Sequence, residues 1–214
     1  MTERAMSERT IAVISAGLSQ PSSTRLLADR LADATVSRLA EQGIRAKVEV
    51  VELRDIAKDV TNNLLAGFPS PSLADVIEKV TTADGLIAVT PIFTTSYSGL
   101  FKSFFDVIDP TALEGMPVVL GATGGSERHS LALEYAMRPM FTYLHTTVVP
   151  TSVYAASADW GSGADTVKAL PDRVERAAGE FATLVAASDR SSLVKDPFEL
   201  EGDFRSMIGG FQAE

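Results

Sequence analysis

Three short segments of this chain combine hydroxyl side chains, glycine and proline, and each follows an apolar run typical of a buried strand. They are residues 15–24 (SAGLSQPSST), 90–99 (TPIFTTSYSG) and 122–126 (ATGGS). Hydroxyls and free backbone N–H groups bind phosphate and carbonyl oxygens, above all where a helix begins. In an open α/β sheet such segments meet at the carboxyl edge, where ligands bind. The three segments therefore predict one small-molecule site.

The first segment has the chemistry of a phosphate site. Ser19, Ser22, Ser23 and Thr24 stand where a predicted helix begins, so hydroxyls, N–H groups and the helix dipole converge there. The segment lacks the patterns G-x-G-x-x-G and G-x-x-x-x-G-K-[ST], which argues against a Rossmann dinucleotide fold and a P-loop NTPase. The alternative is that the cluster only caps the helix.

The second segment offers a surface for a planar ring. Pro91 fixes one φ angle, Thr94 and Ser96 offer hydroxyl donors, and Phe93 is placed to cover a ring face. The alternative is an ordinary strand-to-helix turn in which Ser98 caps the next helix.

The third segment contains a glycine pair, Gly124 and Gly125, past which backbone can approach a ligand with no side chain between. Paired glycines are equally typical of a simple turn. His129 follows shortly after, and the interpretation as a structural histidine is favoured because no Ser or Asp partner for a catalytic triad can be identified.

Composition narrows the chemistry that this site can perform. The 214 residues contain no cysteine and two histidines, which excludes disulfides and thiolate metal sites and argues against a histidine-rich metal site. Any redox chemistry must then come from a bound organic cofactor. The net charge of -9 argues against a nucleic-acid partner. No apolar stretch reaches the ~20 residues of a membrane span, and residues 1–9 are polar, so a cytoplasmic protein is expected.

Alternating patterns then supply the elements that position the three segments. Strands are predicted at residues 10–15, 45–53, 85–90, 116–122 and 146–154, and helices at 22–41, 72–82, 99–108, 128–144 and 165–188. Ser72 is the predicted N-cap of its helix, and Pro139 should kink the helix that contains it. Residues 54–71 lack a clear period and are interpreted as a long connection with up to one turn of helix.

This alternation predicts a three-layer α/β/α sandwich with a five-stranded parallel sheet in the flavodoxin order 2-1-3-4-5. With 45% hydrophobic residues, one domain over residues 10–188 accounts for the core. Residues 1–9 are expected to form a flexible N-terminus. Residues 189–214, charged and glycine-containing, are expected to form an extended or disordered tail.

The three segments together carry a family resemblance. Residues 19–24, the stretch TPIFTTSYSGLFKSFFD from 90 to 106 and the stretch ATGGSERHSLALEYAMRP from 122 to 139 resemble the NAD(P)H-dependent FMN reductases, which have a flavodoxin-like fold. The resemblance is nearest to the branch that supplies reduced flavin to two-component monooxygenases such as the alkanesulfonate system. It covers about residues 11–154 and three motifs in the right order.

The resemblance implies a role for each matching residue. The residues implied to hold the FMN phosphate are Ser19, Gln20, Ser22, Ser23 and Thr24. Those implied to line the ribityl chain and the isoalloxazine ring are Pro91, Ile92, Phe93 and Thr94, with Ser96 nearby. Those implied to meet the pyrimidine edge are Thr123, Gly124, Gly125 and Ser126. Gln20 departs from the many relatives that carry a basic residue there, which predicts weaker phosphate binding.

The implied reaction is hydride transfer from NADPH or NADH to FMN, which needs no catalytic side chain and no metal because the cofactors carry the chemistry. An alternative on the same fold is a reductase of quinones, azo dyes or metal oxyanions that holds FMN tightly. A flavodoxin-like electron carrier is the non-enzymatic alternative, but the phosphate-loop start T-x-T-G-x-T is missing. A flavin-dependent monooxygenase is the implied partner.

The helix at residues 128–144 is apolar on more than one face, which predicts a homodimer or homotetramer. Its residues 133–139 resemble the reductase branch in which this helix packs between subunits and can carry a π-bulge, although Pro139 alone explains a kink. Residues 159–161, Asp-Trp-Gly, are interpreted as a lid or a contact with a neighbouring subunit, with simple packing as the alternative.

Overall fold

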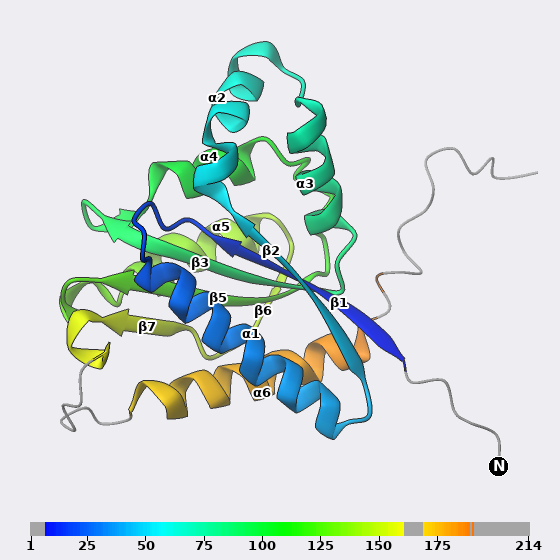
Figure 1. The fold of residues 1–214 in the computed structure, drawn as a ribbon, viewed down its shortest axis with the longest axis vertical. Coiled ribbons are helices and arrows are strands. Elements are labelled where there is room, and N and C mark those ends of the chain that lie inside the picture. The colour runs from blue at the N-terminus through cyan, green and yellow to red at the C-terminus, as the bar shows by residue number, and fades with distance from the viewer. Residues whose placement is uncertain (1–6, 161–168, 189, 191–214) are drawn as a thin grey trace, which may run out of the picture.

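The computed structural model describes residues 7–160, 169–188 and 190. A mostly parallel sheet lies between two layers of helices, and the arrowheads of β3 and β7 in Figure 1 point toward its carboxyl edge. Its strands are β1 (Glu8–Ser15), β2 (Arg45–Glu52), β3 (Gly85–Phe93), β4 (Ser96–Tyr97), β5 (Pro117–Gly124), β6 (Thr147–Val148) and β7 (Val153–Ala156). The flavodoxin-like fold predicted from the sequence is confirmed.

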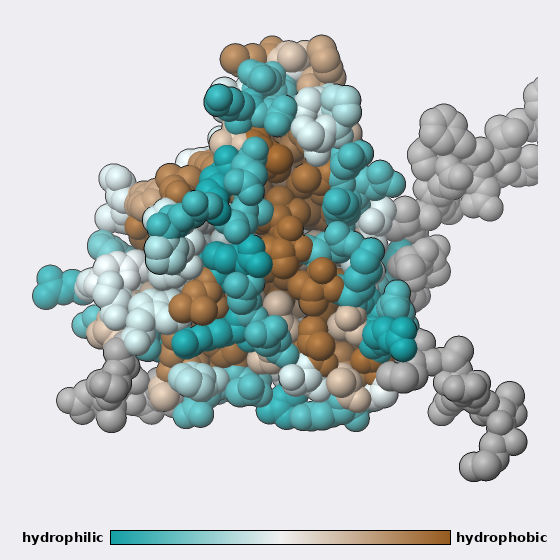
Figure 2. All heavy atoms as spheres, in the orientation of Figure 1, coloured by the Kyte–Doolittle hydropathy of each residue, from teal (hydrophilic) through white to brown (hydrophobic). Residues whose placement is uncertain are grey.

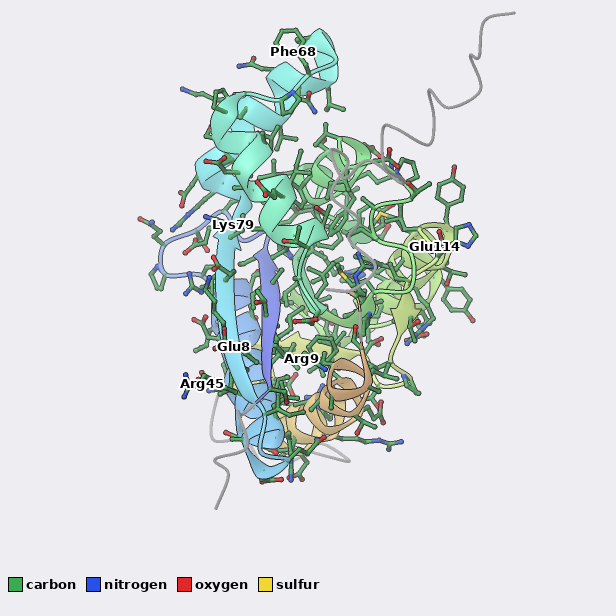
Figure 3. All side chains as sticks on the ribbon, turned by 90° about the vertical axis from the view of Figure 1, so that its right-hand side faces the viewer. Glu8, Arg9, Arg45, Phe68, Lys79 and Glu114 are labelled. Atoms are coloured by element: carbon green, nitrogen blue, oxygen red, sulfur yellow. The ribbon has the colours of Figure 1, made fainter. Side chains whose placement is uncertain are left out.

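The strand order is β2-β1-β3-β5-β6, and β7 pairs with β5 beyond β6. The predicted order 2-1-3-4-5 matches once the two-residue antiparallel strand β4 is set aside. The single strand predicted at residues 146–154 is wrong in one respect, because it is split into β6 and β7 around Pro150, which has no N–H to donate to a sheet. Strand β1 begins at Glu8, opposite Arg45 of β2, within the segment predicted to be flexible (Figure 3).

Two long helices cover one face of the sheet, α1 (Ser23–Glu41) and α6 (Leu170–Ala187). Leu27 and Leu31 of α1 and Phe181 of α6 are fully buried there against apolar side chains of the strands. Contact is close: a Cβ at Gly85 of β3 would lie 2.6 Å from a methyl group of Val185. Helix α6 begins at Leu170, with Pro171 in its first turn, where a missing N–H costs little. The earlier part of its predicted range, to residue 168, lies outside the described residues.

Shorter elements cover the other face. They are the 3₁₀ turn Leu53–Ile56, α2 (Ala57–Ala66), α3 (Pro71–Thr81), α4 (Gly99–Asp106) and α5 (Arg138–Tyr143). The prediction of a long connection at residues 54–71 is wrong, because α2 occupies most of it. Ser72 is not the N-cap of α3: Ser70 accepts the N–H of Leu73 at 3.3 Å, and Pro71 opens the helix.

The helix predicted at residues 128–144 is broken into three parts. A 3₁₀ turn at Glu127–His129 is followed by a π-helical turn at Leu133–Met137, and α5 begins at Arg138. Pro139 stands in the first turn of α5, where proline is tolerated, so the irregularity precedes the proline. The π-bulge that the family resemblance raised is therefore present.

The connection between α2 and α3 forms an apolar tip at the top of the molecule in Figure 2. Leu64, Leu65 and Phe68 are the exposed large apolar residues of this tip, and Figure 3 labels Phe68 at its end. Among the described residues, no helix combines the length and the apolar character that crossing a membrane requires. Apart from Arg190, the tail predicted at residues 189–214 lies outside the described residues.

Candidate functional site

A cleft with a volume of about 440 Å³ opens at the carboxyl edge of the sheet, within the size range of small-molecule sites. The predicted residues that line it are Ser19, Ser23, Thr24, Pro91, Ile92, Phe93, Thr123, Gly124 and Gly125. All three sequence segments therefore meet in one place. The predicted residues outside its lining are Gln20, Ser22, Thr94, Ser96 and Ser126. Gly17 and Leu18 of the first segment also line it, as does Trp160, which the sequence placed in a lid or a subunit contact; Ser157 is the lining residue that sequence reasoning missed.

The hydroxyl groups of the first segment, residues 15–24, have two different roles. Ser22 is the N-cap of α1, and its hydroxyl accepts the N–H of Arg25 at 3.2 Å. The N–H groups of Ser23 and Thr24 have no acceptor among the described residues, and Ser23 is exposed to the cleft. The cap and the anion-binding interpretation therefore both apply, to different residues of the cluster.

Gly17 allows the segment to fold back on α1. A Cβ at this position would lie 2.0 Å from the hydroxyl oxygen of Ser22 and 3.1 Å from Cβ of Thr24. No side chain fits there, because the N-cap hydroxyl already occupies the space. The glycine thus keeps the strand β1, the cap and the free N–H groups close together.

The floor of the cleft is a buried hydrogen bond between Thr24 of α1 and Thr123 of β5. Their hydroxyl oxygens lie 2.8 Å apart, and both residues are almost fully buried. This bond joins two of the three segments directly. It also means that the hydroxyl of Thr24 is partly committed within the protein, unlike that of Ser23.

Arg54 binds the first segment from a distant part of the chain. Its guanidinium donates to the carbonyl oxygen of Ser19 at 3.1 Å and pairs with Glu52 at 2.8 Å. With its amide oxygen turned toward Arg54, Gln20 also accepts at 3.0 Å. Glu52 in turn binds Arg25, whose pKa is raised by its hydrogen bond to Asp29 and by Glu52. The sequence showed no signal for Arg54, which stood in the predicted connection.

The second segment is a tight hairpin rather than an open loop. Strand β3 runs on to Phe93 and pairs with Ser96 of β4, so Thr94 and Thr95 form the turn with φ angles of 49° and 69°. These angles are uncommon for β-branched residues and typical of strained turns near functional sites. Phe93 is 48% exposed at the mouth of the cleft. Ser98 does cap α4, accepting the N–H of Phe101 at 3.2 Å.

The two glycines of the third segment differ. A Cβ on Gly124 would meet the hydroxyl oxygen of Tyr154 at 2.0 Å, whereas a Cβ on Gly125 would enter open space. Tyr154 donates this hydroxyl to the carbonyl of Ser126 at 2.8 Å, and burial together with Glu127 and Asp159 raises its pKa. Gly124 is therefore required by packing, and Gly125 leaves an open approach to the cleft.

The cleft lining suits a phosphorylated, planar ligand. It combines unpaired N–H groups at the start of a helix, small hydroxyl residues and apolar walls, and none of the lining residues in the described part of the chain carries a carboxylate. His129 is exposed and does not line the cleft. No cluster of three or more metal-ligating side chains occurs among the described residues. FMN fits this donor set through its phosphate and its ring.

Comparisons with known proteins agree with this chemistry. Residues 9–161 match the family model described as NADPH-dependent FMN reductase. The chain is 35% identical to an FMN reductase (NADPH) of Pseudomonas aeruginosa, a match that covers 86% of this chain and 96% of that protein. It is 34% identical to the NADH-dependent FMN reductase SfnE of Pseudomonas putida, covering 83% of this chain and 92% of the relative.

Solved structures are similar as well. An oxidoreductase from Corynebacterium diphtheriae has a TM-score of 0.81 at 42% identity, covering 85% of this chain and 98% of that one. An NADH:FMN oxidoreductase in its apo form has a TM-score of 0.70 at 28% identity, covering 82% of this chain and 89% of that one. The family match spans all three cleft segments, so the chain belongs to the NADPH-dependent FMN reductase family.

Proposed function

We propose that this protein is an NAD(P)H-dependent FMN reductase that transfers a hydride from NADPH or NADH to FMN in the carboxyl-edge cleft. The observation that carries the proposal is that Ser23 and Thr24, whose N–H groups have no acceptor among the described residues, line the same cleft as Gly125, which leaves open space there. Family membership supplies the reaction. The matched relatives include enzymes named for NADPH and for NADH, and the proposal covers both nicotinamides.

Each part of the cleft has a task in this proposal. Ser23 and Thr24 bind the FMN phosphate through N–H groups, and Ser23 adds its hydroxyl. Ile92 and Phe93 provide apolar surface for the ring, and Gly125 admits its polar edge. The hydrogen bond between Thr24 and Thr123 holds the phosphate-binding start of α1 in place beside β5. The other predicted phosphate residues, Gln20 and Ser22, support the loop from behind the lining.

Bound FMN supplies the hydride-accepting ring, so the protein has to bind, orient and exclude water rather than move a proton. No residue that lines the cleft in the described part of the chain has a titratable side chain. Hydride transfer between two stacked cofactors is compatible with such a lining. Hydrolytic or acid–base reactions would require a group that this lining does not offer.

The proposal includes assembly as a homodimer or homotetramer. A second pocket of about 520 Å³ lies between α4 and α5, and we name it the helix pocket. Its apolar walls include Phe105, Met140 and Leu144, and Tyr143 at its rim is 74% exposed. Tyr97 of β4 also lines it, while Ile92, its partner across the hairpin, lines the cleft. A neighbouring subunit in the helix pocket would therefore contact the same hairpin that lines the cleft.

Delivery of the reduced flavin to a flavin-dependent monooxygenase belongs to the same proposal, supported by the resemblance of the three segments to that reductase branch. It predicts turnover of free FMN in excess over enzyme. A reductase of quinones, azo dyes or metal oxyanions with tightly held FMN would instead be purified with its flavin and would gain little from added FMN.

The direct experiment is to purify the protein, remove any flavin, and follow NADH and NADPH oxidation with and without FMN. We expect oxidation that depends on added FMN and saturates with it. Oxidation that requires a quinone or azo dye, with FMN bound throughout, would replace this function with the tight-FMN alternative. Absence of oxidation with any flavin, together with electron exchange with a partner protein, would indicate the electron carrier.

A further inference from the structure

Trp160 closes the end of the cleft beyond β7. It is the last residue of the 3₁₀ turn Ser157–Trp160, which lies beside the start of α1 in Figure 1, and it lines the cleft together with Ser23 and Gly124. It is also the one tryptophan in the chain. The family motifs do not include this residue, and the reaction proposed above assigns it no task.

The turn that carries Trp160 is anchored by its neighbour Asp159. One carboxylate oxygen of Asp159 accepts the N–H of Ala156 at 2.7 Å, and the other forms an ion pair with Arg173 of α6. Arg173 also donates to the carbonyl oxygen of Tyr154. The Asp159 side chain is only 8% exposed, so this pair is shielded from competing water. Strand β7 and helix α6 thus hold the turn from two sides.

Arg30 of α1 fixes the indole itself. Its guanidinium carbon lies 5.0 Å from the centre of the Trp160 ring, within the range of a cation–π contact. One face of the indole is therefore covered. A ligand in the cleft would therefore contact the opposite face or the ring edge. Arg30 also stands two turns beyond Ser23 on the same helix, which ties the position of the indole to the helix that binds the phosphate.

From these contacts we infer that Trp160 binds FMN by contact with its free face or edge, and that Asp159 with Arg173, and Arg30, are its positioning residues. The inference rests on the proposed function. A rigid indole held before the ligand arrives offers a flat apolar surface at little entropic cost, because its rotamer is already restricted. Such a flat apolar surface in this cleft suits contact with a planar flavin ring.

Fluorescence of the bound flavin tests the contact. Apoprotein is titrated with FMN, and the affinity and the emission of bound FMN are measured for the wild type, Trp160→Phe and Trp160→Ala. An indole in contact quenches flavin emission by electron transfer, which a phenyl ring does not do. We expect emission to rise several-fold in Trp160→Phe with a Kd near the wild-type value, and the Kd to rise about tenfold in Trp160→Ala, which loses the surface. Phe68→Leu, a change of an exposed aromatic residue at the tip between α2 and α3, is the matched control.

Positioning is tested by Asp159→Asn, compared with Glu175→Gln, because Glu175 also links α6 by an ion pair, to the exposed Arg38 at 2.9 Å. Asp159→Asn should shift the tryptophan emission of the apoprotein to longer wavelength and raise the Kd for FMN about fivefold, whereas Glu175→Gln should change neither. In the Trp160→Ala background the effect of Asp159→Asn on the Kd should vanish, because residues that act through one another are not additive.

Unchanged emission of bound FMN in Trp160→Phe, with an unchanged Kd in Trp160→Ala, would overturn the contact. A tryptophan emission that responds to protein concentration and not to FMN would assign Trp160 to a subunit contact instead. An apoprotein that binds no FMN at all would overturn the proposed function itself, which separates the two failures. Should Trp160→Ala not fold, the emission of Trp160→Phe still decides the inference.

Discussion

The carboxyl-edge cleft and the helix pocket have similar volumes, about 440 and 520 Å³, but different linings. The cleft is built by the ends of strands, where backbone N–H groups, glycines and small hydroxyl residues face outward. The helix pocket is built between α4 and α5, whose backbone groups are already paired, so side chains form its walls: large apolar ones such as Phe105 and Met140, and the ion pair of Lys102 with Asp106. The volume of a concavity therefore indicates little about its ligand. Whether strand ends or helix sides surround it indicates more.

The two concavities share one wall, the β3–β4 hairpin. Along its paired strands, Ile92 lines the cleft and Tyr97, opposite it, lines the helix pocket. If the comparison holds, changes in the cleft should alter flavin binding without altering assembly. Changes in the helix pocket should alter assembly first and flavin turnover second, through this wall.

The largest effect is expected from Gly125→Val. The new side chain meets no protein atom within 4 Å at its Cβ, so it fills the cleft without damaging the fold, and φ at Gly125 is not positive, so no strain is added. We expect the KM for FMN to rise about 30-fold, equivalent to about 2 kcal/mol of overpacking, with an unchanged melting temperature. Gly124→Ala is the contrasting variant, because its clash with Tyr154 should lower the melting temperature. An unchanged KM in Gly125→Val would remove Gly125 from the ligand cleft.

Ser23→Ala should weaken FMN binding about tenfold through loss of one charge-assisted hydrogen bond, while riboflavin, which has no phosphate, should bind as before. Isothermal titration with both flavins measures this. Thr24 is less suited to the test, because its hydroxyl also binds Thr123 inside the protein. Ser37→Ala, whose hydroxyl donates to Asp33 on the exposed side of the same helix, is the control. Equal losses for both flavins would show that Ser23 only supports the helix start.

Tyr143→Glu tests the helix pocket. A carboxylate at this exposed rim should oppose burial by a second subunit, so size-exclusion chromatography with light scattering should show a smaller species, and flavin reduction should fall about threefold. Met137 is unsuitable because it is fully buried in the core. Leu65→Glu, at the exposed tip between α2 and α3, is the control. A monomeric wild type would contradict the assembly proposal. A mutant monomer with full activity would contradict only the claim that assembly affects flavin turnover through the β3–β4 hairpin.

The smallest effect is expected from Thr95→Gly in the shared hairpin. Glycine removes the strain of the positive φ of 69° but raises the conformational entropy of the unfolded chain. Because the strain is the larger of the two, we expect a net gain of about 0.5–1 kcal/mol in the free energy of unfolding. Chemical denaturation measures it. Thr82→Gly, at a φ of -90°, should instead lose stability. A loss of stability in Thr95→Gly as well would mean that the turn carries no strain.

Much of the fold was predictable because it rests on local chemistry. Alternation of apolar runs with helical periods placed β1, α1, β3 and β5 within a few residues of their bounds, and right-handed parallel connections then left few topologies. Helix α2 was missed because its ten residues follow a 3₁₀ turn without a clear period. One strand was predicted at residues 146–154, without its break, because β-branched residues stand on both sides of Pro150.

The sequence by itself determined which segments line the cleft, because hydroxyl clusters, glycine pairs and strand-to-helix transitions are local patterns. Only the tertiary structure decided how the members of each cluster divide their tasks. Ser22 caps α1, the Ser23 hydroxyl has no hydrogen-bond partner among the described residues, and Thr24 binds Thr123 across 99 residues of sequence. Trp160 reaches the cleft from the turn after β7, and Arg54 binds the carbonyl oxygen of Ser19 from outside the cleft lining. These contacts depend on which strands become neighbours, and that is fixed by packing of the whole core rather than by any local run of residues.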